Sequence, residues 1–335
     1  MTASLPLLDE FGRRAEDLRV SLTDRCNLRC SYCMPAEGLP WLPREGLLTA
    51  AELARLISLA VTRLGVREVR FTGGEPLLRP DLEQVIAATA ALTPRPEISF
   101  TTNGIGLDRR IDGLRAAGLD RVNVSLDTLD PATFTTLTRR DRHADVLTGL
   151  QAARQAGLAP VKINAVLIRG VNDHEAADLL TFCHDHGYEL RFIEQMPLDP
   201  QGAWDRDRLV TAAEILQCLT AAGFELTPVA SHERGSAPAE RWTVNGGPST
   251  VGIIASVTRP FCRACDRTRL TADGQVKSCL FGQDEHDLRT LLRAGATDSE
   301  LATAWAAAMA GKPAGGAITS SGFIQPARTM SAVGG

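Results

Sequence analysis

Three cysteines lie close together near the start of the chain, at Cys26, Cys30 and Cys33. This spacing puts three thiolates on one loop, where they can bind three irons of a 4Fe–4S cluster. The fourth iron then stays open to a substrate or cofactor, as one position does on a catalytic zinc. Zinc is the alternative, but a structural zinc site wants four protein ligands, and no fourth Cys or His is near this loop in the sequence. The spacing therefore favours an iron–sulfur cluster.

A second group of three cysteines lies near the other end of the chain, at Cys262, Cys265 and Cys279. The long gap before Cys279 contains Asp273-Gly274, a turn signal that predicts a hairpin carrying Cys279 back towards the other two. Three ligands again predict a cluster with an open iron. The alternative here is a zinc ribbon completed by His286.

Two arginines lie between the cysteines of the second group. On a strand, Arg267 and Arg269 project from the same face. Two guanidinium groups beside an open cluster make a compact anion site that suits phosphate oxygens. A solvated pair of arginines is the alternative, and it would be the better interpretation without the cluster.

Polar and glycine-containing segments follow four of the strands that the sequence predicts. They lie at 72–76, 101–104, 125–127 and 196–197. In a βα barrel, ligands bind at the carboxyl ends of the strands, so these segments should converge on the rim that carries the first cysteine loop. In Gly73-Gly74-Glu75, the missing side chains permit a close backbone approach, and free carbonyls and a carboxylate suit an ammonium group. The alternative for an isolated Gly-Gly before proline is an ordinary turn.

The rest of the chain supplies the elements that must position these groups. Short apolar runs alternate with stretches of helical period, a pattern typical of repeated βα units. Strands are predicted at 19–23, 68–71, 97–101, 121–125, 160–167 and 189–194, and helices at 49–64, 81–92, 108–117, 143–156 and 173–186. Near 228–240 the pattern breaks, which predicts a βα domain over 1–227 and a smaller domain over 228–335 with a hairpin at 267–270 and 275–280.

Composition restricts the function classes. The chain has 335 residues, 36 Lys and Arg, 40 Asp and Glu, and a formal net charge of −4, so it has no broad cationic field for nucleic acid. Its start lacks the apolar core of a signal peptide, and no apolar run is long enough to span a membrane. We expect a soluble cytoplasmic enzyme whose eight cysteines are metal ligands or buried thiols.

The spacing of the first cysteine group, with Tyr32 just before its last member, resembles that of the radical S-adenosylmethionine (SAM) superfamily. Over its whole length the chain resembles the GTP 3′,8-cyclases, the radical enzymes that make the first pterin precursor of molybdenum cofactor. The motifs that carry the resemblance lie at 26–33, 72–76, 101–104, 123–127, 162–164, 191–194, 261–269, 279–282 and 334–335.

The resemblance implies a partial six-stranded (βα) barrel of the radical SAM type, followed by a C-terminal domain with a second cluster. It implies two 4Fe–4S clusters on the six cysteines and a flexible tail at Gly334 and Gly335 that reaches the active site. The SAM contacts that it implies are Tyr32, Gly74, Ser125 and Met196. The GTP contacts that it implies are Arg19, Arg70, Thr101, Lys162, Arg267, Thr268 and Arg269. Five of these are cations on an acidic chain, which suits a triphosphate.

In the reaction that the resemblance implies, a 5′-deoxyadenosyl radical takes the 3′ hydrogen of GTP, and C3′ then attacks guanine C8. The implied partners are GTP, an electron donor and, functionally, the next enzyme, cyclic pyranopterin monophosphate synthase. A homodimer is compatible with the resemblance, although the sequence leaves the oligomeric state open. Two alternatives remain: a radical SAM maturase acting on a peptide, and a non-catalytic iron–sulfur or zinc module.

Overall fold

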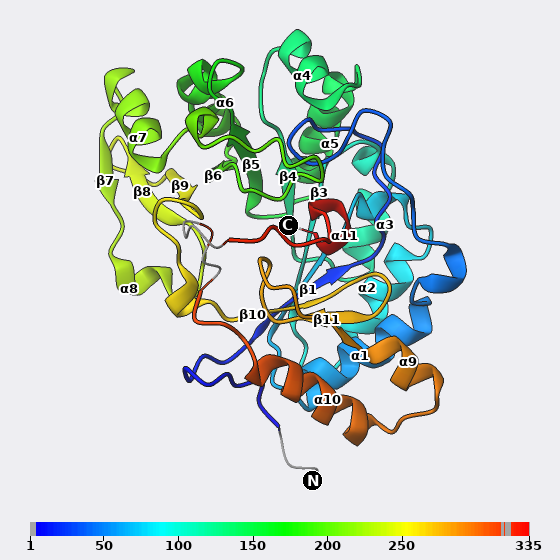
Figure 1. Cartoon of the computed structure of the whole chain (residues 1–335). Helices are drawn as coiled ribbons and strands as arrows, with labels where there is room; N and C mark the ends of the chain where they lie inside the picture. The colour runs from blue at the N-terminus through cyan, green and yellow to red at the C-terminus, as the bar shows by residue number, and fades with distance from the viewer. Residues whose placement is uncertain (1–4, 316–317, 319–322, 335) are drawn as a thin grey trace.

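Twelve strands form a single sheet in the computed structural model, which describes residues 5–315, 318 and 323–334 (Figure 1). The strands are β1 (Asp17–Ser21), β2 (Glu68–Thr72), β3 (Glu97–Thr102), β4 (Arg121–Ser125), β5 (Val161–Leu167), β6 (Glu189–Glu194), β7 (Leu226–Pro228), β8 (Glu240–Val244), β9 (Thr250–Ile254), β10 (Arg267–Leu270), β11 (Gln275–Lys277) and β12 (His286–Asp287). Their order across the sheet is β12-β11-β10-β1-β2-β3-β4-β5-β6-β9-β8-β7.

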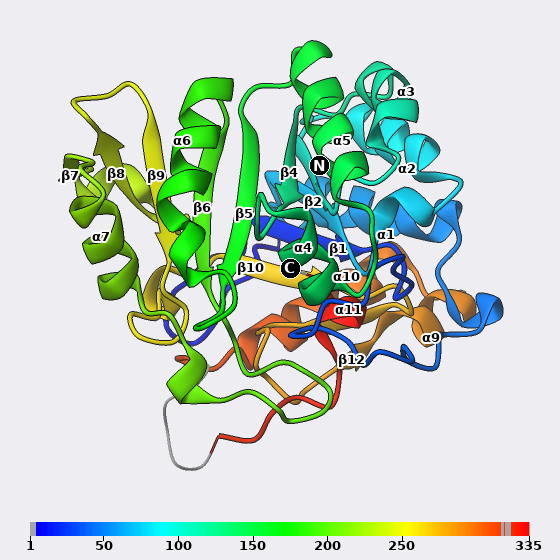
Figure 2. The same ribbon diagram turned by 90° about the horizontal axis from the view of Figure 1, so that it is seen from above.

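Helices cover the outer side of the curved sheet (Figure 2). The helices of the described residues are α1 (Ala50–Thr62), α2 (Leu82–Ala90), α3 (Ile111–Ala116), α4 (Pro131–Thr138), α5 (His143–Gln155), α6 (Ala176–His186), α7 (Ala212–Ala221), α8 (Ser231–Arg234), α9 (Leu288–Arg293), α10 (Asp298–Ala310) and α11 (Met330–Val333). Of these, α11 lies on the inner side of the sheet. A capping box formed by Thr49 and Glu52 begins α1. Among the described residues, no helix is long and apolar enough to cross a membrane.

The two faces of the sheet carry different chemistry because side chains alternate along each strand. On β2, Phe71 packs into the core under the helices, whereas Arg70 takes the opposite face. Phe100 and Phe192 are likewise fully buried in that core. Strands β1–β6 and their helices thus form a barrel wall that is apolar outside and polar inside.

The second half of the chain continues both edges of the six-stranded wall. On one side β9 runs parallel to β6, with Leu190 opposite Val251. On the other side β10 runs parallel to β1, with Asp17 opposite Arg267 and Arg19 opposite Arg269. Residues from opposite ends of the chain therefore share one interior.

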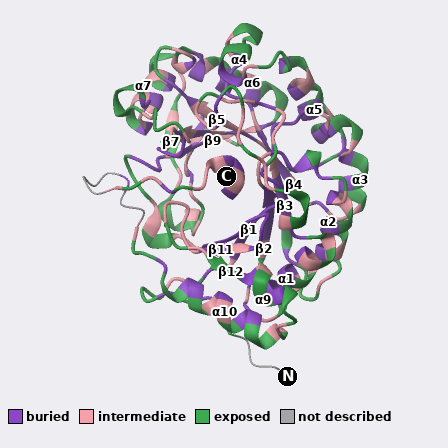
Figure 3. Ribbon diagram, turned by 45° about the vertical axis from the view of Figure 1, so that its right-hand side comes forward, coloured by how far each residue is buried: buried purple, intermediate pink, exposed green. Residues whose placement is uncertain are grey.

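The C-terminal tail lies inside the barrel. Helix α11 occupies the centre of the ring of mostly buried strands (Figure 3), and the Ser21 hydroxyl donates to the Val333 carbonyl at 2.6 Å. Val333 and Ser331 are both buried. The tail is therefore part of the wall of the interior.

The predicted partial barrel is confirmed. Its six predicted strands are also present, and each begins within two residues of the predicted position. The predicted helix over 108–117 is instead a 3-10 turn (Leu107–Arg109) followed by α3, and α4 was not predicted. The division of the chain at residue 227 stays a prediction, since the strands on both sides of it belong to one sheet.

Candidate functional site

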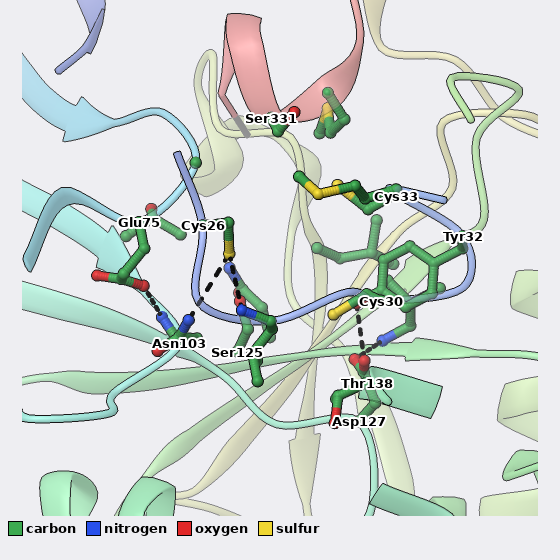
Figure 4. Close-up of a pocket in the computed structure, with 18 of the residues that line it drawn as sticks. Cys26, Cys30, Tyr32, Cys33, Glu75, Asn103, Ser125, Asp127, Thr138 and Ser331 are labelled. Carbon is green, nitrogen blue, oxygen red and sulfur yellow. Dashed lines mark hydrogen bonds between the residues drawn. The ribbon is translucent and has the colours of Figure 1, made fainter. Parts of the chain in front are cut away.

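A pocket lies at the carboxyl ends of strands β2–β6, the rim that the sequence predicted. The three cysteines of the loop after β1 line it together with Gly74, Ser125 and Met196. Cys26, Cys30 and Cys33 point into this space, and Ser331 of the tail faces them (Figure 4). The structure therefore brings together all the residues that the resemblance implied for the first cluster and for SAM, Tyr32 included.

The first cysteine group consists of buried thiols. Burial raises the pKa of Cys26 to about 11, and burial with the nearby Cys26 sulfur raises that of Cys33 to about 12. Such thiols lose their protons when iron takes the place of the proton. The backbone amide of Leu28 donates to Cys26 Sγ at 3.4 Å, and the side-chain amide of Asn103 lies 3.9 Å from the same sulfur. Three thiols with such donors around them fit a 4Fe–4S cluster.

Within the described residues, no three His, Cys, Asp or Glu side chains are placed to hold a single metal ion. In a 4Fe–4S cluster each cysteine binds a different iron, so a cluster does not need three ligands grouped around one ion.

Gly73 and Gly74 are required by the cysteine loop itself. A Cβ on Gly74 would lie 2.2 Å from the Arg25 carbonyl oxygen, and one on Gly73 would lie 2.3 Å from that of Thr23. The Gly74 amide donates to the Thr23 carbonyl at 2.7 Å. The close backbone approach that the sequence predicted is therefore made by the loop that carries the cysteines.

The carboxylate of Glu75 ties this turn to the next strand. It accepts from the backbone amide of Leu77 at 2.9 Å, the Thr102 hydroxyl at 2.7 Å and the backbone amide of Asn103 at 2.7 Å. Burial raises the pKa of Glu75 to about 7 in spite of these donors. The sequence suggested that this carboxylate suits an ammonium group, but in the structure it holds β2 against the loop after β3.

Asp127 is a pocket residue whose role was not predicted. The Tyr32 hydroxyl donates to Asp127 Oδ2 at 2.7 Å, and the Val166 amide donates to Oδ1 at 2.9 Å. Burial raises the pKa of Asp127 to about 6. Its place in the 123–127 motif was a usable signal, since an acid at the end of a barrel strand faces the ligand rim.

Deeper in the barrel, the inward faces of the strands carry a cluster of cations. The members that the resemblance implied are Arg19, Arg70, Lys162, Arg267 and Arg269, and their strand positions point them into the interior. Arg191 of β6 joins them, although the sequence placed it in a motif without a role. Thr101 accepts from Asn123 at 3.3 Å on the same inward face.

Acids at the strand starts neutralise part of this cluster. Asp17 accepts from Arg19 Nε at 3.0 Å and lies 3.5 Å from Arg267 Nε. Glu189 lies 3.4 Å from Lys162 Nζ and 3.7 Å from Arg191 Nη2. Burial would raise the pKa of Asp17, but the charges of Arg19 and Arg70 hold it well below its ordinary value.

Two of the cations have no such partner. In the part of the chain that the structure describes, Arg70 and Arg269 make no ion pair, and their partners are the Ser99 hydroxyl at 3.2 Å and the Gly334 carbonyl at 2.7 Å. Burial and then the charge of Arg19 lower the pKa of both, that of Arg269 to about 9. The interior therefore has an excess of buried positive charge that an anion would relieve.

Thr268 differs from its neighbours. Its side chain is on the outer face of β10, where its hydroxyl accepts from Trp305 Nε1 at 3.0 Å. It is fully buried there, against α10. Alternation along the strand gives the interior to Arg267 and Arg269, so a contact between Thr268 and a ligand in the barrel would have to use backbone atoms.

The second cysteine group lies next to β10 and β11. Cys262 begins a 3-10 turn (Cys262–Ala264), Cys265 follows it, and Cys279 comes after β11. Burial opposes ionisation of Cys265, but the charges of Lys312 and Arg267 outweigh it and lower its pKa. The surroundings of Cys265 thus favour its thiolate, the form that binds iron, whereas burial raises the pKa of Cys279. His286, the fourth ligand of the zinc alternative, is exposed on β12.

The predicted tail is only partly described. Gly334 lies in the barrel with φ of +75°, and a Cβ there would lie 2.4 Å from Thr72 Cγ2. Gly335 lies outside the described residues. Gly334 lies against Thr72 of β2 and accepts from Arg269, so it reaches the cation cluster.

Comparisons with known proteins agree with this geometry. Residues 20–183 match the radical SAM superfamily, and residues 188–318 match the family described as Molybdenum Cofactor Synthesis C. The chain is 65% identical to a GTP 3′,8-cyclase of Streptomyces coelicolor over 98% of this chain and 96% of that one. It is 62% identical to a GTP 3′,8-cyclase of Mycolicibacterium smegmatis over 98% and 92% of the two chains.

A similar fold occurs in a crystal structure of Streptococcus suis SuiB bound to S-adenosylmethionine. The TM-score is 0.57 at 16% identity, over 90% of this chain and 68% of that one. At this identity the likeness concerns the fold alone.

The glycine at position 74 gives the first prediction. Gly74→Ala places a methyl group against the Arg25 carbonyl and should displace the cysteine loop. We expect the variant to lose about half of its iron and sulfide, because the second cysteine group is untouched. Anaerobic iron and sulfide analysis measures this, and full retention of both would contradict the proposed contact.

The outward side chain of Thr268 gives the second prediction. Thr268→Val leaves Trp305 Nε1 without its acceptor, which should lower the free energy of unfolding by about 1–3 kcal/mol in urea denaturation. GTP affinity should stay within about twofold, because the side chain faces α10. A large loss of GTP affinity with unchanged stability would show that the hydroxyl serves the ligand instead.

Proposed function

The chain belongs to the GTP 3′,8-cyclase family, and we propose residue by residue how its barrel carries out the reaction of that family. It is a radical SAM enzyme that converts GTP to (8S)-3′,8-cyclo-7,8-dihydroguanosine 5′-triphosphate, the first step of molybdenum cofactor biosynthesis. The observation that carries the proposal is the shared interior, in which the cations of β1, β2, β5 and β10 lie below a rim of three cysteines.

At the rim, Cys26, Cys30 and Cys33 hold one 4Fe–4S cluster, and Tyr32, Gly74, Ser125 and Met196 contact SAM. When bound, the cluster and SAM supply a 5′-deoxyadenosyl radical. The hydrogen bond to Asp127 orients the phenol of Tyr32 in the pocket. Asp127 in turn accepts from the backbone amide of Val166 on β5. These contacts hold the rim rigid, so a ligand bound there keeps a fixed direction towards the interior.

At the other end of the interior, Cys262, Cys265 and Cys279 hold the second cluster, and the cations bind the triphosphate of GTP. Arg70 and Arg269 contribute most, because in the described residues neither forms an ion pair with a carboxylate that GTP would have to displace. Arg19, Lys162 and Arg267 bind while still paired with acids, and Thr101 and the backbone of Thr268 complete the set. We add Arg191 to the proposed GTP contacts, since it lies beside the same carboxylate, that of Glu189, as Lys162 does.

Bound in this way, the ribose of GTP lies between the phosphate cations and the rim. Its 3′ hydrogen is taken at the rim, and a new bond then joins C3′ to C8 of the guanine. The barrel wall excludes water from these steps, since the outer faces of its strands are packed under helices. Gly334 of the C-terminal tail lines the same space and accepts a hydrogen bond from Arg269.

Further partners belong to the same proposal. The enzyme uses an electron donor and passes its product to cyclic pyranopterin monophosphate synthase. It acts in the cytoplasm, where its eight unpaired cysteines stay reduced. A homodimer is compatible with this function. The peptide maturase reading gives no reason for a cluster of six cations in the barrel, and the relatives do not favour it.

One incubation tests the function. The reconstituted protein is incubated without oxygen with a reductant, SAM and GTP, and the products are identified by mass. We expect 5′-deoxyadenosine and a cyclised product with the same mass as GTP, because the hydrogen lost from C3′ is balanced by the one that the guanine gains when one electron and one proton reduce it. Formation of 5′-deoxyadenosine without consumption of GTP would contradict the cyclase assignment and favour another substrate.

Lys162 gives a prediction for pH dependence. Burial and the charge of Arg191 lower the pKa of Lys162 to about 8, and only the protonated amine attracts phosphate. GTP affinity, measured by equilibrium dialysis, should therefore fall several-fold between about pH 7.5 and 9 as the amine loses its proton. Lys162→Met should bind more weakly at the lower pH and show a flatter profile. An unchanged slope in that variant would assign the pH dependence to another group.

A further inference from the structure

Arg328 is the most heavily paired side chain of the C-terminal tail. Its Nε and Nη2 atoms donate to both oxygens of Glu285, at 2.7 and 2.6 Å. Its Nη1 and Nη2 atoms donate to both oxygens of Asp273, at 3.0 and 3.1 Å. One guanidinium group thus makes two bidentate contacts, the strongest geometry available to arginine. None of these contacts belongs to the site described above.

The two acids are held by their own surroundings. Asp273 is buried in the turn after β10 and accepts from the Thr271 hydroxyl at 2.6 Å. Glu285 lies 3.1 Å from the ammonium group of Lys277, a side chain that is 1% exposed. Asp273 therefore belongs to the hairpin of β10 and β11, which also carries Arg267 and Arg269, and Glu285 directly precedes β12, the strand that pairs with β11. Burial opposes the charge of Arg328, but the two acids raise its pKa above the ordinary value.

Beyond Arg328, the tail is held by neutral groups. Gly334 N donates to the Met330 carbonyl at 2.8 Å, closing the turn of α11, and Ser21 donates to Val333. Among the described residues of this end, the one charged partner is Arg269, whose guanidinium donates to the Gly334 carbonyl. This is a donor that the triphosphate also needs, so substrate and tail compete for Arg269.

We propose that Arg328 is a positioning residue, whose contacts with Asp273 and Glu285 hold the tail in the barrel when the phosphates of GTP take Arg269 from Gly334. The inference rests on the proposed function, because that function places a phosphate on Arg269. A tail fixed at residue 328 keeps residues 329–334 at high effective concentration next to the substrate after their contact with Arg269 is lost. Without the contacts of Arg328, the hydrogen bonds between neutral groups alone would have to hold the tail in the barrel.

Hydrogen exchange of the amides of residues 329–334 tests the proposal in the protein with both clusters. In the wild type we expect these amides to stay protected when GTP is added. In Arg328→Met they should exchange at least tenfold faster with GTP bound, kcat should fall at least tenfold, and KM should change less than threefold. Arg328→Lys should restore part of the protection, since lysine keeps the charge but not the bidentate geometry.

The matched control is Arg293→Met. Arg293 makes a bidentate contact with Glu52 on the outside of the barrel, at 2.7 and 3.1 Å, so the variant loses a similar pair far from the tail. Its tail amides and kinetics should match the wild type.

Two results would overturn the proposal. Tail amides that are as protected in Arg328→Met as in the wild type would show that other contacts hold the tail. Loss of iron from Arg328→Met, measured per chain, would show that Arg328 supports the loop of Cys279 instead. Failure of the wild type to consume GTP would refute the proposed function separately, because the exchange measurement needs no turnover.

Discussion

The pairing of β1 with β10 is the constraint on which the site depends. These strands lie more than 240 residues apart in the chain, yet they run parallel in register, with Arg19 beside Arg269. Asp17 lies between the two halves and pairs with both Arg19 and Arg267. Without this pairing the second cysteine group and its arginines would face solvent. With it, they face the space below the first cysteine group.

The interior is ordered by charge along the strands. Acids lie at the starts of β1, β2, β3 and β6, cations follow them on β1, β2 and β6, and small polar groups and thiols line the rim. The acids offset only some of the cations, since Arg70 and Arg269 pair with no carboxylate in the described chain. A buried excess of positive charge is costly unless an anion completes it, so the fold is prepared for a ligand with several negative charges.

Much of this site could be predicted from the sequence because its signals are local. The cysteine spacings, the strands and the glycines at 73–74 each depend on a few neighbouring residues. The parts that were missed depend on long-range contacts. No local pattern shows that Tyr32 meets Asp127, that Thr268 faces Trp305, or that Arg328 meets Glu285. The sequence predicted a close backbone approach at Gly74, but it did not show that the partner is the cysteine loop, because only folding brings the two segments together.

The most direct test of the account compares one cation from each half of the chain. Arg70→Met and Arg269→Met are suitable, because neither change leaves a buried carboxylate unpaired. If both halves form one triphosphate site, each variant should raise the Kd for GTP by about tenfold or more while keeping the wild-type iron content. A loss of affinity in Arg269→Met alone, with normal GTP binding by Arg70→Met, would contradict the shared interior.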